Sequence, residues 1–278
     1  MDKPGAARKA AWMAISSPNA SDGDFPWWLV AAVFLGVAGA LFIAADEGLS
    51  RTFEVVAAGI TTTIFVTLAG FAMACVIGLA IATMALSQRR WLRQVARFYV
   101  EIVRGVPILV LLFYIAFVGA PALVWLVNVF AEPLGMKMGV RDFPLIWRAA
   151  IALTIGYSAF IAEVFRAGIQ SVPKGQIEAA TALGMRPWAR FRTVVLPQAI
   201  RTILPPLGND FVAMVKDSSL VSVLGVADVT QLGKLYASSS FRFFETYSIV
   251  AYIYLVLTIS LSLGVRAIEK RLRREPRG

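Results

Sequence analysis

The sequence predicts an all-α membrane protein with six transmembrane helices and both termini in the cytoplasm. Three observations support this prediction: the composition, the length of the apolar stretches and the distribution of Lys and Arg. Hydrophobic residues make up 58% of the 278 residues and charged residues only 16%, whereas soluble domains are about half apolar and about a quarter charged. So few charged side chains cannot cover a water-facing surface, and we therefore expect lipid to surround the chain.

Six stretches are candidates to cross the hydrocarbon core, which takes about 20 residues of helix. The first, 27–45, is an uncharged run of 19 residues, longer than the apolar region of a signal peptide, so we expect a retained helix. The preceding segment, 1–26, contains Pro, Ser, Asn and Asp and predicts a poorly ordered leader. The second stretch, 55–88, is uncharged and longer than one crossing needs.

Proline or charge interrupts the next two spans. Residues 105–131 are uncharged but contain Pro107 and Pro121, and we place the third span at about 99–118. The fourth span, 144–162, is apolar apart from Arg148 near its start.

The fifth span is the one that a strict hydropathy filter would omit. Residues 196–215 contain Arg201 and Asp210, and a charge at the centre of a membrane helix costs roughly 2.5–3.5 kcal/mol on insertion scales. The sixth span, 246–265, is uncharged. Counting 196–215 keeps the basic C-terminal segment on the same side as the other basic segments.

The distribution of Lys and Arg supports this topology. With a cytoplasmic N-terminus, the inside segments are 1–26, 89–104, 163–201 and 266–278, and they hold 20 of the 27 Lys and Arg residues. Acidic residues divide into 8 inside and 9 outside, so the asymmetry lies in the basic residues, as the positive-inside rule expects. The net charge of +10 is spread over four segments, which argues against a nucleic-acid-binding face.

Residues that carry common enzyme chemistry are almost missing from the sequence. There is no histidine and a single cysteine, Cys75. This composition excludes histidine-based catalysis, a Ser-His-Asp triad, the usual zinc sites and a disulfide within the chain. We therefore predict no catalytic residue and no metal site, and we interpret Cys75 as a small core residue.

The polar segment 163–197 predicts two short helices. Pro173 suits the first position of a helix and Gly184 the residue just past a helix end, so the first helix is expected at 173–183. Pro187 then begins a second helix that extends to about Val195. An amphipathic loop at the membrane interface is the alternative interpretation.

The residue spacing in this segment resembles the EAA signature of ABC importer permeases. Glu178, Ala179 and Ala180 precede Gly184, and the run VVLP at 194–197 follows after nine further residues, with valine in place of the usual isoleucine. Other segments resemble the branch for polar amino acids, the histidine, glutamate, glutamine, arginine and opine group. They are YVEIVRGVP (99–107), AEVFRAGIQSVPKGQ (162–176), LPQA (196–199), LPPLGNDF (204–211) and KDSSL (216–220).

The resemblance covers about residues 59–269 and implies a type I ABC importer permease core with one extra N-terminal helix. The implied divisions are a cytoplasmic leader (1–26), the added helix with a short external loop (27–50), the core (51–270) with its coupling loop (163–197), and a basic cytoplasmic tail (271–278).

The resemblance also implies partners. The coupling loop would dock on a cytoplasmic dimer of ATP-binding subunits through Gln176, Glu178, Ala179, Ala180, Leu183 and Gly184. ATP and Mg would bind to that partner, and no cofactor would bind to this chain. The chain has no Walker A loop, because Gly233-Lys234 is followed by Leu235 rather than by Ser or Thr. The other implied partners are a second permease chain (the same or a sister), an external or periplasmic solute-binding protein, an amino-acid substrate and membrane lipids. The implied location is the bacterial inner (plasma) membrane.

Polar residues in and after the fifth span predict a path for a zwitterion. In a helix, Asn209 and Asp210 lie about 20 Å from the start of the span, in its outer half, and Lys216 lies near the outer mouth. The predicted path residues are Asn209, Asp210, Lys216, Asp217, Ser218 and Ser219, with Ser218 where the family usually has threonine. The alternative is that Asp210 pairs with a neighbouring helix and only stabilises the bundle.

Two further features concern the helix ends and the helix packing. Glu101/Arg104 and Glu163/Arg166 have i,i+3 spacing near the cytoplasmic ends of spans three and four, and predict gate or interfacial ion pairs. The second span carries small residues at four-residue spacing, which predict close helix packing; they are Gly70, Ala74 and Gly78.

The leading hypothesis is a transport subunit, the membrane-spanning part of an ATP-driven amino-acid importer. A secondary, ion-coupled transporter is the first alternative, although no paired broken segments mark inverted repeats. A non-transporting membrane scaffold is the second, and the residue inventory disfavours an intramembrane enzyme.

Overall fold

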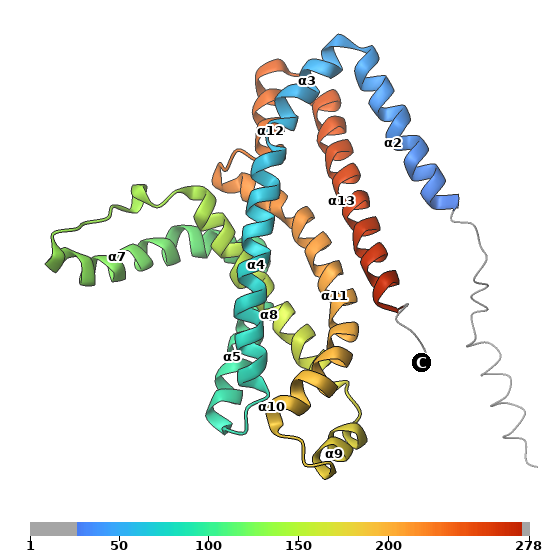
Figure 1. Ribbon diagram of the computed structural model, residues 1–278. Coiled ribbons are helices and arrows are strands. Elements are labelled where there is room, and N and C mark those ends of the chain that lie inside the picture. Colours follow the sequence, from blue (N-terminus) through green and yellow to red (C-terminus); the bar gives the residue numbers. More distant parts are fainter. Residues whose placement is uncertain (1–26, 274–278) are drawn as a thin grey trace, which may run out of the picture. The chain divides into compact units, whose positions relative to one another are not determined.

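The computed structural model describes residues 27–273, in which every regular element is a helix (Figure 1). The chain divides into two units, residues 1–42 and 43–278, and each is described by itself. The predicted leader at 1–26 and the end of the predicted tail, 274–278, lie outside the described residues. Five helical stretches of the described part are long and apolar enough to cross a membrane.

The first unit contains most of helix α2 (Trp27–Ala45). The helix has the bounds predicted for the first span and is one of the five membrane candidates. Its large side chains are exposed, for example Phe34 at 70% and Leu41 at 67%, as expected of side chains that lipid covers.

The second unit begins with α3 (Glu47–Ala57) and α4 (Ile60–Ala85). The side chain of Asp46 caps α3 by accepting a 2.8 Å hydrogen bond from the Leu49 amide. The two helices together form the second membrane candidate, Glu47–Ala85.

Small residues bring α4 close to α8, the helix with which it packs most extensively. Gly70, Ala74 and Gly78 are all buried. A Cβ at Gly78 would lie 3.1 Å from the backbone nitrogen of Ala162 and from the carbonyl oxygen of Ser158. The predicted close packing of the second span is therefore confirmed.

The third span is predicted in the wrong place. The apolar span is Ile108–Ala131, whereas the preceding helix α5 (Arg90–Gly105) is amphipathic. Pro107 separates the two, because the residue before a proline is held extended, as Val106 is here. Pro121 does not end the span, since it follows a wider π-helical turn in which the regular backbone hydrogen bonds are already interrupted. The span consists of α6 (Ile108–Tyr114), the π-helical turn (Ile115–Gly119) and α7 (Ala120–Ala131).

Helix α8 (Leu145–Gln170) is central to the second unit and packs against α4, α5, α6 and α11. Its Leu153, Tyr157 and Ile161 are buried in one core cluster with Val66 of α4 and Met214 of α11. The predicted span 144–162 covers only the apolar part of this helix. Two 3₁₀ turns, Glu132–Leu134 and Val140–Asp142, precede it.

The segment after α8 contains both predicted short helices. They are α9 (Lys174–Ala182) and α10 (Pro187–Arg190), and α10 continues through a π-helical turn (Phe191–Val195) into α11 (Leu196–Asp217). Pro173 precedes the first helical residue rather than occupying that position. Helix α11 is continuous through Pro205 and Pro206; it is not among the five apolar candidates, although its 22 residues match the fifth predicted span.

The chain closes with a 3₁₀ segment (Ser218–Leu224), α12 (Val229–Ser240) and α13 (Phe243–Arg273). Asp228 caps α12 by accepting hydrogen bonds from the amides of Thr230 and Gln231. Helix α13 includes the sixth predicted span and packs against α3, α11 and α12. The count of six spans and the side on which the termini lie stay predictions.

Candidate functional site

Helix α9 ends at Ala182, and Gly184, two residues further on, has a φ of +71°. The Gly184 amide donates to the Thr181 carbonyl (2.9 Å) and the Met185 amide donates to the Ala180 carbonyl (3.1 Å). These two bonds form a Schellman-type helix end, for which glycine is suited because it adopts positive φ without steric cost. The predicted helix end at Gly184 is confirmed.

One face of α9 is exposed and the other is packed. Leu183 is 82% exposed, whereas Ala180 is only 4% exposed. The other predicted coupling residues are also exposed; they are Gln176, Glu178, Ala179 and Gly184. Five of the six are thus accessible to a partner, and Ala180 supports the helix from its inner side.

Helix α9 is attached to the beginning of α11. Gln198 of α11 donates a hydrogen bond to the side-chain oxygen of Gln176. Ile177 packs on a cluster that includes Val195 and Ala199. A displacement of α9 would therefore be transmitted to α11, since close-packed contacts move as a body.

A cavity of about 390 Å³ lies between α5, α6, α8 and α11. Its polar lining consists of Arg104 of α5, Tyr157 of α8, and Asp210 and Asp217 of α11. Apolar side chains, among them Leu111 and Phe160, form much of the remainder. Within residues 27–273, no three Asp, Glu, Cys or His side chains gather as metal ligands would.

The two acids of this cavity differ in their partners. Tyr157 donates a 2.7 Å hydrogen bond from its hydroxyl to Asp217 Oδ2. Asp210 Oδ2 is buried and has no hydrogen-bond partner, and the ion pairs of residues 27–273 do not include Asp210. No ion-pair partner of Asp210 lies among the described residues, and whether Asp210 stabilises the bundle or lines a path stays a prediction.

The remaining predicted path residues do not line this cavity. Asn209 and Lys216, seven residues apart, are exposed on another face of α11. Ser218 is buried and donates to the Val215 carbonyl (2.7 Å), and the carbonyl of half-buried Ser219 accepts from Ser222. The structure thus brings together Asp210 and Asp217 from the predicted set, and separates the other four.

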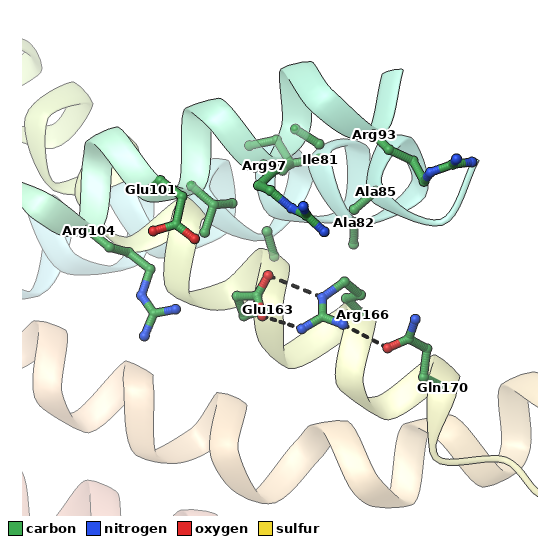
Figure 2. Close-up of a pocket in the computed structure, with 13 residues that line it drawn as sticks. Ile81, Ala82, Ala85, Arg93, Arg97, Glu101, Arg104, Glu163, Arg166 and Gln170 are labelled. Atoms are coloured by element: carbon green, nitrogen blue, oxygen red, sulfur yellow. Dashed lines mark hydrogen bonds and ion pairs between the residues drawn. The ribbon is translucent and has the colours of Figure 1, made fainter. Parts of the chain in front are cut away.

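Of the two predicted charge pairs, the structure brings together only Glu163 and Arg166. Arg166 binds Glu163 in a bidentate manner, with an Nε to Oε1 distance of 3.1 Å, and also donates to Gln170 (Figure 2). The ion pairs among residues 27–273 do not include Glu101 or Arg104. Arg104 instead lies over the Phe160 ring, 5.2 Å from its centroid, where the ring face attracts the cation.

Sequence reasoning missed Tyr157 and the place of Arg104 in the cavity. Both depend on tertiary contacts, since Tyr157 and Asp217 are 60 positions apart. The hydroxyl of Tyr157 was the one available signal, and it is a weak one, since Thr154 and Ser158 carry hydroxyls in the same span.

Residues 74–274 match the family described as the binding-protein-dependent transport system inner membrane component. The chain belongs to this family. The matched region contains the α9 segment and every polar residue of the cavity. The chain is thus a permease of the ABC importer type, as the resemblance implies.

Curated relatives and solved structures agree with this membership. The chain is 39% identical to the probable glutamine ABC transporter permease protein GlnM of Bacillus subtilis (strain 168), over 78% of this chain and 92% of the relative. It is 36% identical to the glutamine transport system permease protein GlnP of Escherichia coli (strain K12), over 77% and 91%. A solved amino acid ABC transporter with histidines is 37% identical, with a TM-score of 0.68 over 81% of this chain and 97% of that chain.

A more distant structure shares the fold alone. The inward-facing MetNI methionine ABC transporter is 20% identical, with a TM-score of 0.60. The predicted fold class is therefore confirmed as an all-α ABC importer permease, without the exact number of spans. The comparisons support the permease hypothesis and not the ion-coupled transporter.

Proposed function

We propose that this permease passes a polar amino acid across the bacterial inner membrane, driven by ATP hydrolysis on a partner chain. The proposal rests on one observation above all. A single cavity holds Arg104 on α5 opposite Asp210 and Asp217 on α11. An amino acid carries one ammonium and one carboxylate, so its recognition needs groups of both signs.

The carboxylates of the cavity suit the ammonium of the substrate. Asp210 has an unpartnered buried oxygen, and Tyr157 fixes the orientation of Asp217. An ammonium between the two acids would give Asp210 Oδ2 the hydrogen bond that it lacks. Such charge-assisted bonds are stronger than neutral ones.

Arg104 suits the carboxylate of the substrate. Lys216, the cation among the predicted path residues, is exposed on another face of α11 and does not line the cavity. The guanidinium can bind a carboxylate through two parallel hydrogen bonds. The glutamine permeases among the relatives support an amino acid as the substrate class.

The exposed face of α9 is the proposed docking site for a cytoplasmic dimer of ATP-binding subunits, on which ATP and Mg bind. The contact would use Gln176, Glu178, Ala179, Leu183 and Gly184, which are exposed. Since α9 is bonded to α11 through Gln176 and Gln198, closure of the ATPase dimer would shift the helix that carries Asp210. This is rigid-body coupling of two packed elements.

The proposed assembly contains a second permease chain, the same or a sister, and an external solute-binding protein. The helices of one chain enclose only part of a path, so a second chain completes it. Both termini of this chain face the cytoplasm in the proposed topology, and the N-terminal helix α2 is an addition to the five-helix core.

The experiment is amino-acid uptake by proteoliposomes that contain the assembled complex with ATP inside. We expect uptake to require ATP and to persist without an ion gradient; uptake driven by an ion gradient alone would contradict the proposal. Asp210→Asn should lower uptake per assembled complex roughly tenfold, as expected for the loss of a hydrogen bond to a charged group of about 1.5 kcal/mol. Lys216→Gln removes a charge from the exposed face of the same helix and should leave uptake near the original value. Equal effects of Asp210→Asn and Lys216→Gln on uptake would show that the cavity is not part of the transport path.

A further inference from the structure

A second cavity, also of about 390 Å³, lies between α4, α5 and the C-terminal part of α8 (Figure 2). Four arginines and two glutamates line it, which gives the cavity a net charge of +2. They are Arg93, Arg97, Glu101 and Arg104 of α5 and Glu163 and Arg166 of α8.

Two of the four arginines are already used within the chain. Arg166 is bound to Glu163. Arg93 donates to the carbonyls of Ser87 (2.8 Å) and Gln88 (2.9 Å) just after α4. The first contact lies within α8, and the second joins the start of α5 to the segment that follows α4.

The other two arginines have no ion pair among the described residues, 27–273. Arg97 and Glu101 extend from α5 toward α8 in Figure 2, and Arg104 lies over Phe160. With Glu163 neutralised by Arg166, and with Arg93 still charged because its carbonyl partners are neutral, the charges left are three arginines and Glu101. The cavity therefore retains positive charge that an anion would balance.

The same helix also carries an apolar stripe. Exposed Trp91, Val95, Phe98 and Ile102 follow at three- and four-residue spacing and are 49–69% exposed. This spacing places them together on one side of α5, about a third of a turn around the helix from the side that carries the arginines. A helix with a basic face and an aromatic-rich apolar face is typical of a membrane interface.

We propose that this cavity binds the phosphate group of an acidic phospholipid, whose acyl chains lie along the stripe of Trp91, Val95, Phe98 and Ile102. The proposal goes beyond the transport function and uses the proposed topology only to place the cavity at the inner leaflet. Basic cavities between helices at the cytoplasmic surface suit anionic headgroups. Arg104 lines both cavities, so a bound headgroup would contact the residue that also faces the proposed substrate cavity.

The test measures lipid binding to the full-length chain in detergent by native mass spectrometry. Phosphatidylglycerol and phosphatidylcholine are compared, because both carry a phosphate and only the first has a net negative charge. We expect phosphatidylglycerol to bind at least about fivefold more tightly, and Arg97→Gln to reduce its affinity roughly fivefold, since one arginine near an anionic lipid contributes about 1 kcal/mol. Arg97→Lys, which keeps the charge, should retain most of the affinity.

The matched control is Arg90→Gln, which removes an exposed arginine from the same helix outside the cavity. It should leave the phosphatidylglycerol affinity unchanged. Equal losses for Arg90→Gln and Arg97→Gln would show diffuse surface attraction and overturn the proposal. Unchanged affinity in Arg97→Gln would overturn it as well. Displacement of the lipid by inorganic phosphate at comparable concentration would identify a free-phosphate site instead and overturn the lipid assignment.

Discussion

Tyr157 and Asp217 join the middle of α8 to the end of α11 through a 2.7 Å hydrogen bond from the phenol to the carboxylate. Both residues line the cavity that also contains Asp210 and Arg104. The bond holds Asp217 in one orientation, so the proposed substrate site depends on a residue that need not touch the substrate itself.

We predict that Tyr157→Phe weakens substrate recognition more than it weakens the fold. The apparent KM of uptake should rise several-fold, while the free energy of unfolding falls by about 0.6 kcal/mol, the mean for hydrogen bonds between membrane helices. Uptake kinetics and thermal unfolding of the same preparations measure the two effects.

The control for this prediction is Tyr99→Phe. The Tyr99 hydroxyl shares a 2.7 Å hydrogen bond with Ser158 between α5 and α8, and Tyr99 does not line the cavity. Tyr99→Phe should lower the free energy of unfolding by a similar amount and leave the KM of uptake unaltered. If both variants raise KM equally, Tyr157 has no positioning role.

The sequence predicted those features that depend on local chemistry. Gly184 was predicted at a helix end because glycine suits positive φ, and its φ is +71°. Gly70 and Gly78 were predicted at a close helix contact, and both are buried against α8. In each case the residue's own steric properties determine the local structure.

Features that depend on contacts between distant segments could not be predicted from the sequence. The third span was misplaced because Pro107 and Pro121 are alike in sequence, whereas only Pro107 follows an extended residue that breaks the helix. The predicted path joined neighbours in sequence, yet Asp210 and Asp217 lie on one face of α11 and Asn209 on another. Helical periodicity alone could have made that division.

We predict that Arg148 is required for stability through its hydrogen bonds to carbonyls. It is 8% exposed, and its guanidinium donates to the carbonyls of Phe143 (3.0 Å) and Val140. Arg148→Met should lower the free energy of unfolding by about 1–3 kcal/mol, because it leaves partly buried carbonyl acceptors without their donor. Thermal unfolding in detergent measures this loss.

Arg141→Met is the control, since Arg141 is an exposed arginine in the same connection between α7 and α8. Its melting temperature should match that of the unchanged protein. A melting temperature of Arg148→Met equal to that of the control would show that the carbonyls find other donors.

We predict that Gly184→Val uncouples the ATPase without preventing membrane insertion. A Cβ at Gly184 would meet no atom within 4 Å, so the cost is conformational: roughly 1–2 kcal/mol for an L-residue in the left-handed region, and more for a β-branched one. The end of α9 should therefore rearrange and misplace Leu183. ATP hydrolysis stimulated by substrate should fall, while expression stays normal.

Gly184→Asn is the matched variant, because asparagine tolerates the left-handed conformation. It should retain most of the stimulated hydrolysis. Normal stimulation in Gly184→Val would count against α9 as the coupling helix.

The last prediction is that α11 crosses the membrane despite its charges, which places both termini in the cytoplasm. Arg201, Asp210 and Lys216 each cost roughly 2.5–3.5 kcal/mol at the centre of an isolated helix, but α11 is not isolated. It packs against α8 and α13, and Asp210 faces a cavity within the protein rather than lipid. Alkaline phosphatase, which is active only after export, should be active when fused after Ser240 and inactive when fused after Gly278. Deletion of α11 should reverse the result at Gly278, since one crossing is lost. Phosphatase activity at Gly278 in the intact chain would overturn the six-span topology.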